Sequence, residues 1–224
     1  MKKSLLLSIV MTLVLVVAMS TATFAWYTAN ATATATASRI QAESAASNIQ
    51  ISNAEAGTYA QSVKLDDVGT VAAVVPTAEL DNDGDSWRKA TVAYTGDTPT
   101  YTWTDGSVTA KTVWLYNNGG SAVNVNATAA AVAADGAAGD ISGKVQYAIF
   151  IGDTLIGRSN YKYVTSANEA TNVGTAAEAE ATSYSLLPKT ATAVTIYIWI
   201  EGIELVNTEA NYAADVTVTF AKAA

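Results

Sequence analysis

The chain contains no cysteine and no histidine among its 224 residues. Without cysteine it can form neither disulfide bonds nor thiolate metal sites. Without histidine it lacks the usual general base near neutral pH, the commonest zinc ligand and every Ser-His-Asp or Cys-His arrangement. We therefore expect a protein that is not an enzyme, and hydrolase chemistry in particular is improbable.

Charged side chains and phenylalanine are also scarce. Only 14% of the residues are charged, and 20 acidic residues against 12 basic ones give a net charge of −8. A chain without a basic patch is not expected to bind nucleic acid, whereas an acidic surface suits solubility outside a cell. With three Phe, the five Trp and eleven Tyr must fill much of the core. The alternative use of exposed Trp side chains is sugar binding.

The N-terminal segment is typical of a secretory signal peptide. A basic start at Lys2 and Lys3 is followed by a long apolar run without charge. Cleavage after Ala25 leaves Trp26 as the first mature residue, and cleavage after Ala31 is a second choice. We expect signal peptidase to remove residues 1–25, so that the mature protein is secreted to the extracellular space or cell surface and has no membrane partner.

An alternative is that the apolar segment is retained. Residues 4–25 are just long enough to span a bilayer. The chain would then be a pilin with a hydrophobic N-terminal helix. No basic cluster follows the run to stop its transfer across the membrane, which favours cleavage.

Residues 26–37 alternate almost strictly between alanine and threonine or asparagine after an initial Trp-Tyr pair. Side chains of a strand point to opposite faces with a period of two, so the alanines share one face. The pattern predicts a β-strand that is either an edge strand of its own domain or a strand donated to a neighbouring subunit. The residues that we expect to mediate polymerisation are Trp26, Tyr27, Ala29, Ala31, Ala33, Ala35 and Ala37.

One dense group of carboxylates is a weak candidate for calcium. Asp81, Asp83 and Asp85 alternate around Gly84, as in the first half of a calcium-binding loop. The loop lacks the glutamate expected at its twelfth position, which is Val92. A solvated acidic turn is the alternative, and no other cofactor or metal is indicated.

The remaining chain reads as short strands separated by turns. The clearest strand covers residues 193–200 and carries bulky side chains on both faces, which predicts a central position between two layers. Val216, Val218 and Phe220 are predicted to face inward from a last strand. Such a pattern favours an all-β fold, an antiparallel β-sandwich with a jelly-roll-like topology and an N-terminal extension strand.

Local signals predict several further features. Asp105-Gly106 predicts a hairpin turn into a return strand at residues 108–116. A second hairpin at residues 117–120 completes a meander. Residues 129–139 are predicted to form a loop, with a helical turn at residues 129–134 as the alternative, and residues 38–47 have a helix-compatible composition. The predicted organisation is a signal peptide at 1–25, a donor strand and linker at 26–47 and a sandwich domain at 48–224.

Several short motifs resemble a known family. They are Thr23-Phe24-Ala25-Trp26-Tyr27-Thr28 after the leader, the Val75-Pro76-Thr77 to Trp87 segment, Val113-Trp114-Leu115-Tyr116-Asn117-Asn118, the strand from Val145 to Ile149, and Trp199-Ile200-Glu201-Gly202. In these the chain resembles the SipW-dependent secreted proteins of the TasA and camelysin group of biofilm fibre subunits. The resemblance implies a jelly-roll-like sandwich that forms a head-to-tail homopolymer, because the N-terminal strand of one subunit completes a sheet of the next. The metalloprotease activity that the camelysin label implies is not carried over, because the chain has no histidine.

The sequence thus predicts a structural subunit of an extracellular filament or biofilm matrix fibre. The alternatives are a monomeric cell-surface adhesin that depends on sugar or calcium, and the pilin described above. Leu187-Pro188-Lys189-Thr190-Ala191 looks like a sortase signal. We interpret it as a turn entering the clearest strand, because no hydrophobic tail follows the domain.

Overall fold

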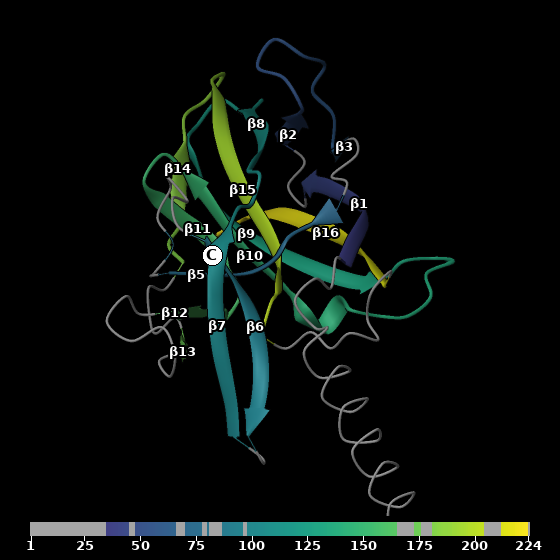
Figure 1. Ribbon diagram of the computed structural model, residues 1–224. Helices are drawn as coiled ribbons and strands as arrows, with labels where there is room; N and C mark the ends of the chain where they lie inside the picture. Colours follow the sequence, from purple (N-terminus) through teal and green to yellow (C-terminus); the bar gives the residue numbers. More distant parts are fainter. Residues whose placement is uncertain are drawn as a thin grey trace, which may run out of the picture.

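The computed structural model describes residues 35–44, 48–65, 70–77, 80, 87–95, 98–164, 173–175, 181–203 and 212–223. These residues are mostly β-strands, which form two facing sheets around one hydrophobic core (Figure 1). Most neighbouring strands pair antiparallel. The predicted all-β sandwich is therefore confirmed.

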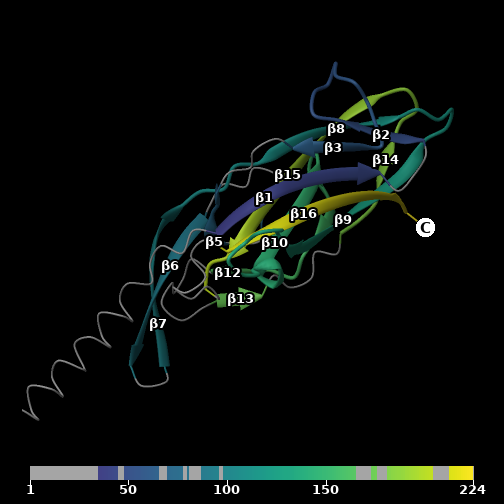
Figure 2. The ribbon, with the colours of Figure 1, turned by 90° about the vertical axis from the view of Figure 1, so that its right-hand side faces the viewer.

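The first sheet contains β1 (Ala35–Ser44), β3 (Ser62–Leu65), β4 (Thr70–Val71), β9 (Val123–Ala133), β14 (Tyr184–Leu186) and β16 (Ala213–Lys222). Its strand order is β14-β9-β16-β1-β3, and β4 also pairs with β1. Figure 2 shows β1, β16 and β9 running side by side. The first and last strands of the described chain are thus neighbours, and they pair parallel.

The second sheet contains β2 (Ile49–Ser52), β5 (Ala73–Pro76), β6 (Trp87–Thr95), β7 (Thr98–Gly106), β8 (Lys111–Asn117), β10 (Val145–Ile151), β11 (Thr154–Arg158) and β15 (Ala191–Glu201). Its order is β11-β10-β15-β5-β6-β7, while β8 pairs with both β15 and β2. A separate pair consists of β12 (Lys162–Val164) and β13 (Val173–Thr175). The 3-10 turn η2 (Ser142–Lys144) precedes β10.

Strand β15 lies at the centre of the second sheet, as its sequence predicted. It pairs with β10, β8 and β5. Both of its faces are buried over most of its length, from Ile196 to Glu201. A strand that is covered on both faces needs large apolar side chains on both faces, and the Ile-Tyr-Ile-Trp-Ile run supplies them.

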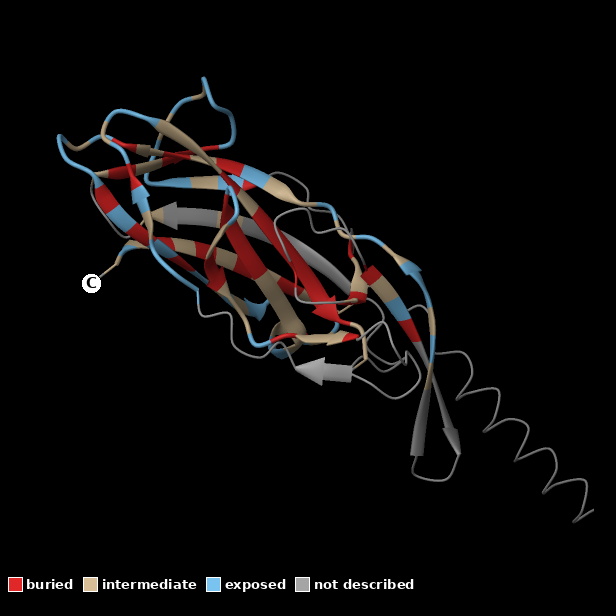
Figure 3. Ribbon diagram, turned by 90° about the vertical axis from the view of Figure 1, so that its left-hand side faces the viewer, coloured by how far each residue is buried: buried red, intermediate tan, exposed pale blue. Residues whose placement is uncertain are grey.

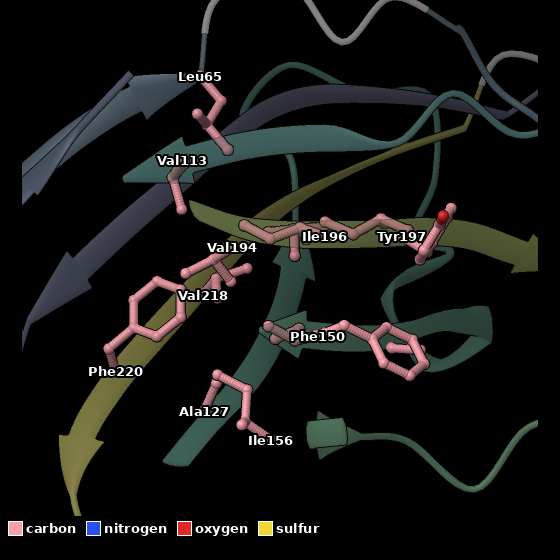
Figure 4. Packing of buried hydrophobic residues seen from close by; sticks show 14 of the residues in the cluster. Leu65, Val113, Ala127, Phe150, Ile156, Val194, Ile196, Tyr197, Val218 and Phe220 are labelled. Carbon is pink, nitrogen blue, oxygen red and sulfur yellow. The ribbon is translucent and has the colours of Figure 1, made fainter. Parts of the chain in front are cut away.

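The core lies between the two sheets. Val216, Val218 and Phe220 of β16 are buried, which confirms their predicted inward orientation. Figure 3 shows the buried positions along the inner faces of the strands, and Figure 4 shows Phe220 near Val194 of the opposite sheet. Full burial of one such large side chain contributes about 1.5–3 kcal/mol, so contacts of this kind hold the sheets together.

The dipeptide Asp105-Gly106 does not form the predicted hairpin turn. It ends β7, whose partner is β6, and the hairpin closes where Thr95 pairs with Thr98. Asp105 instead forms an ion pair with Arg88 across this ladder. A Cβ on Gly106 would lie 2.8 Å from the Val74 side chain, so the glycine serves close packing against β5.

The predicted meander is also wrong, and so is the predicted loop where it covers residues 129–133. Residues 134–139 do form a loop, as predicted. Strand β8 belongs to the second sheet and β9 to the first, so the chain crosses between sheets after Asn117. Strand β9 then continues to Ala133 as an alanine-rich strand. Alanine has a low β-propensity, but each of these residues is paired with β16, and this tertiary pairing overrides the propensity.

Residues 38–44 form part of β1 and are not helical. The sandwich, which was expected to begin at residue 48, thus already includes residues 35–44. Strand β1 pairs with β16 from Thr36 to Ser44, with a register shift between Ala37 and Arg39. Its other side pairs with β3 and β4. The composition of this segment could not reveal these partners, because they lie far away in the sequence.

Two features mark the periphery of the sandwich. The β6–β7 hairpin projects from one end as a two-stranded ribbon (Figures 1 and 2), and within the described residues only Trp87 and Arg88 of β6 pair with β5. On another side, β11 passes close to β9. A Cβ on Gly157 would lie 2.2 Å from the carbonyl oxygen of Ala127, a distance that requires a glycine.

We predict that Gly157→Ala destabilises the fold. The added methyl group overlaps with the backbone of β9, which is part of a continuous ladder and cannot yield easily, and overpacking of this kind costs about 1–3 kcal/mol. Gly143→Ala is the matched control, because a Cβ there meets nothing within 4 Å. Urea unfolding measures both variants, and equal stability of the two would contradict the close approach of β11 to β9.

Candidate functional site

The structure places two of the seven residues predicted to mediate polymerisation. Ala35 pairs with Val71 and Ala37 with Ala214, both within their own domain. Trp26, Tyr27, Ala29, Ala31 and Ala33 lie outside the described residues. The last residues of the Ala/Thr repeat are therefore an intramolecular strand, and any donation to a neighbour concerns the part that precedes residue 35.

The repeat ends where β1 changes register. The pairing with β16 shifts between Ala37 and Arg39, which leaves Ser38 as an extra residue. Such bulges increase the local twist and separate one stretch of a strand from the next. The repeat thus enters the sheet as a strand and is followed by the longer Arg39–Ser44 ladder, which runs in parallel register with Asp215 to Phe220.

Strand β9, which lies on the other side of β16 from β1, has an incompletely covered outer edge. Strand β14 pairs with Val123, Asn124 and Val125 only. Within the described ranges, no strand pairs with residues 129–133 on the side away from β16. The sequence analysis missed this edge because it assigned these residues to a loop; the available signal was an alternation-free run of small, uncharged residues.

The calcium candidates Asp81, Asp83 and Asp85 lie outside the described residues. The residues that flank them are anchored in the core. The Leu80 backbone N–H donates to the Tyr161 hydroxyl at 3.1 Å, and Trp87 packs against Trp199 with 5.0 Å between ring centroids. In the part of the chain that the structure describes, no three acidic residues come together as a metal site.

Several of the large aromatic side chains pack in the core. Trp199, Tyr161, Trp87 and Tyr197 are at most 5% exposed. Trp199 makes edge contacts with Tyr161 and Trp87, each with 5.0 Å between ring centroids. The Arg158 guanidinium lies 4.7 Å from the centre of the Tyr161 ring. These rings therefore stabilise the fold and are not available to bind sugar.

Tyr101 and Trp103 form a different kind of pair, on β7 of the projecting ribbon. Their rings are stacked, with 5.7 Å between centroids and 24° between planes. Both residues are partly exposed. This pair is thus a partly exposed aromatic cluster midway along the ribbon.

Glu201, in the Trp199–Gly202 motif, is buried at the end of β15. Its Oε2 accepts a hydrogen bond from the Lys162 backbone N–H at 3.2 Å. The adjacent Gly202 donates its backbone N–H to Val74. The side chain therefore ties β12 to the second sheet, which is a structural role.

The segment that looks like a sortase signal forms the turn into β15. Lys189 has a positive φ of 58°, and its Nζ donates to both oxygens of Asn118, at 2.7 Å and 2.8 Å. The buried Asn117 donates from Nδ2 to the carbonyl oxygens of Ser121 and Leu186. These hydrogen bonds connect residues 117–118, where the chain crosses between the sheets, to the segment that enters β15.

The pKa values of Asp140 and Tyr59 are shifted, and both shifts have local causes. The hydrogen bond from the Ser142 backbone N–H lowers the pKa of the exposed Asp140, with the Ser142 side chain adding to it. Burial raises the pKa of Tyr59, and the Glu55 carboxylate adds to that shift.

Comparison with protein-family models and with curated proteins finds no match for this chain. Within the described residues, no helix has the length and apolar character needed to cross a membrane.

We predict that Asn117→Ala destabilises the protein by about 2–3 kcal/mol. The substitution leaves the buried carbonyl of Leu186 and the Gly119 N–H without their side-chain partner, and a buried unsatisfied polar group costs about 1–3 kcal/mol. Asn118→Ala is the control, because its contacts with Lys189 are exposed. Chemical denaturation should show a near-normal Asn118→Ala variant; a comparable loss in both would contradict the assigned role of Asn117.

Proposed function

We propose that the protein is a secreted, non-enzymatic structural subunit of an extracellular filament or biofilm matrix fibre. Its subunits join head to tail, the N-terminal strand of one completing a sheet of the next. One observation carries the proposal. The Ala/Thr repeat ends in β1, a strand in the interior of the first sheet, and residues 26–34 before it have the same alternating sequence.

The chemistry of the repeat suits strand addition. Main-chain hydrogen bonds supply affinity, and alternate side chains supply register. The β-branched threonines favour extended backbone, and the alanines allow close approach to a neighbouring sheet. A head-to-tail contact that does not close on itself propagates into a filament.

The donated segment is residues 26–34. Signal peptidase cleavage after Ala25 would leave this segment at the free N-terminus, with Trp26 and Tyr27 as apolar anchors at its start. Ala35 and Ala37, which were first included in the donor strand, pair within their own domain. They mark the point at which the donor strand enters the subunit that donates it.

We predict that the mature protein polymerises alone and that removal of residues 26–34 abolishes this. Filaments should be visible by negative-stain electron microscopy for protein beginning at Trp26, which N-terminal sequencing of the secreted form identifies. The truncated protein keeps β1 intact and should retain its far-UV circular dichroism and its unfolding midpoint. Filaments that persist after the truncation would rule out the proposed assembly.

The Tyr101–Trp103 pair favours a second function, that of a sugar-binding adhesin. Stacked, partly exposed rings offer an apolar face to the ring of a sugar. Under this alternative, Trp103→Ala reduces binding to cell-wall polysaccharide in a pull-down assay and leaves filament formation unchanged. Under the filament model the mature protein polymerises whether or not polysaccharide is present.

A further inference from the structure

We propose that the outer edge of β9 at residues 129–133 receives residues 26–34 of a second copy of this chain. The proposal rests on the proposed function and adds the acceptor to it. The acceptor edge is the outer edge of β9 at Ala129 to Ala133.

Hydrogen bonds at the two ends of β9 establish which backbone groups point outward. The Asn124 carbonyl accepts from Ala223 at 2.8 Å, and the Ala134 N–H donates to Ala213 at 3.2 Å. The pairs between them follow one another residue by residue. Because backbone groups alternate sides along a strand, the even-numbered residues bond to β16, and Ala129, Ala131 and Ala133 direct their N–H and C=O groups to the outer edge.

Among the described residues, strand pairing on the outer side of β9 is limited to its beginning. Strand β14 pairs with the first three residues of β9, and Gly157 of β11 covers the carbonyl of Ala127. Figure 4 shows Ala127 beside Ile156 of β11. Beyond this point, none of the described strands pairs with the acceptor edge.

The burial of β9 indicates that a neighbour is missing here. Its inward-facing residues change from buried at Val125 and Ala127 to half-buried at Ala129 and exposed at Ala133. The inward-facing residues opposite the acceptor edge on β16, which are Ala214, Val216 and Val218, are fully buried. The inward side chains of β9 are therefore less buried than those of β16 at the acceptor edge. This difference lies on the outer side of β9, where a further strand would pair.

The acceptor edge also lacks the usual protection of sheet edges. Natural edges are kept short or carry charges and proline, which discourage pairing with another chain. Strand β3 has four residues including Lys64, β14 has three, and β7 carries Pro99 and Asp105. Residues 129–133 contain no charge, proline or glycine.

The N-terminal segment has the properties that this edge requires. Residues 26–34 carry no charge, and their alanines fall on one face. Small side chains suit the narrow space next to the contact between Gly157 and Ala127. The alanine face would cover Ala129 and Ala131, and the threonine face would continue the exposed surface of Thr128 and Ala130.

The occupant is expected to come from a second copy because of where β1 begins. Ala35 lies on the far side of β16 from β9. Its own upstream segment would have to cross three strand spacings, about 14 Å, before it could turn and pair. That crossing uses roughly four residues, whereas the segment of a neighbouring molecule can pair along its whole length.

Cysteine cross-linking tests the proposal in a chain that has no cysteine of its own. Mature Thr32→Cys protein is mixed with Ala130→Cys or Val132→Cys protein under mild oxidation. We expect a disulfide-linked dimer with at least one of these two partners, because facing residues of paired strands are close enough to bridge. The matched control partner is Ser62→Cys, at the exposed position on β3 at the opposite edge of the same sheet.

The outcomes separate this proposal from the proposed function. If filaments form but neither Ala130→Cys nor Val132→Cys cross-links to Thr32→Cys, the acceptor edge is not the site of strand addition, whether or not Ser62→Cys cross-links. The proposed fibre function would remain. Absence of both filaments and cross-links contradicts both proposals. In the double variant with Thr32→Cys and Val132→Cys, covalent oligomers support donation between copies, and a monomer with an internal disulfide overturns it.

A pair of proline variants tests the edge by a second route. Ala131→Pro removes an N–H that points to the outer edge, so the fold should persist. Polymerisation should lose one hydrogen bond between subunits, which raises the critical concentration about tenfold. Ala130→Pro removes an N–H of the ladder with β16 and should lower the unfolding midpoint instead. Unchanged polymerisation of folded Ala131→Pro protein would overturn the proposal.

Discussion

The parallel ladder between β1 and β16 is the interaction on which the first sheet depends. Within the described residues, β3 and β4 are attached to that sheet through β1 alone. Strand β16, whose inward side chains are fully buried, has β1 as one of its two neighbours. A subunit that gave up β1 would therefore lose half of a sheet, which limits exchange between molecules to the residues that precede it.

The parts of the fold that could be predicted are those where bulk alternates with polarity. Strand β15, strand β16 and the β10–β11 hairpin all carry β-branched or aromatic residues in a clear pattern, bounded by glycine or charged turns. The alanine-rich half of β9 has no such contrast, because alanine is neither clearly apolar nor strand-forming. Its assignment depends on β16, which is about 80 residues away in the sequence.

Local turn signals failed for a different reason. Asp105-Gly106 has the composition of a hairpin turn, but here the aspartate serves an ion pair with Arg88 and the glycine a close contact with Val74. At the candidate site, periodicity indicated the Ala/Thr repeat as a strand. It could not show that the repeat ends inside its own sheet, nor which edge lies open, because both depend on pairing between distant segments.

The direction of β1 also has a mechanical consequence. Hydrogen bonds in a sheet lie across the strands, and β1 has partners on both sides over much of its length. A pull on the chain from its N-terminal side acts along the strand axis, so it loads these bonds together in shear and does not open them one after another. A fibre in which tension passes from one subunit to the next through residue 34 would place that load on the longest parallel ladder among the described residues, with Phe220 and its neighbours packed beneath it.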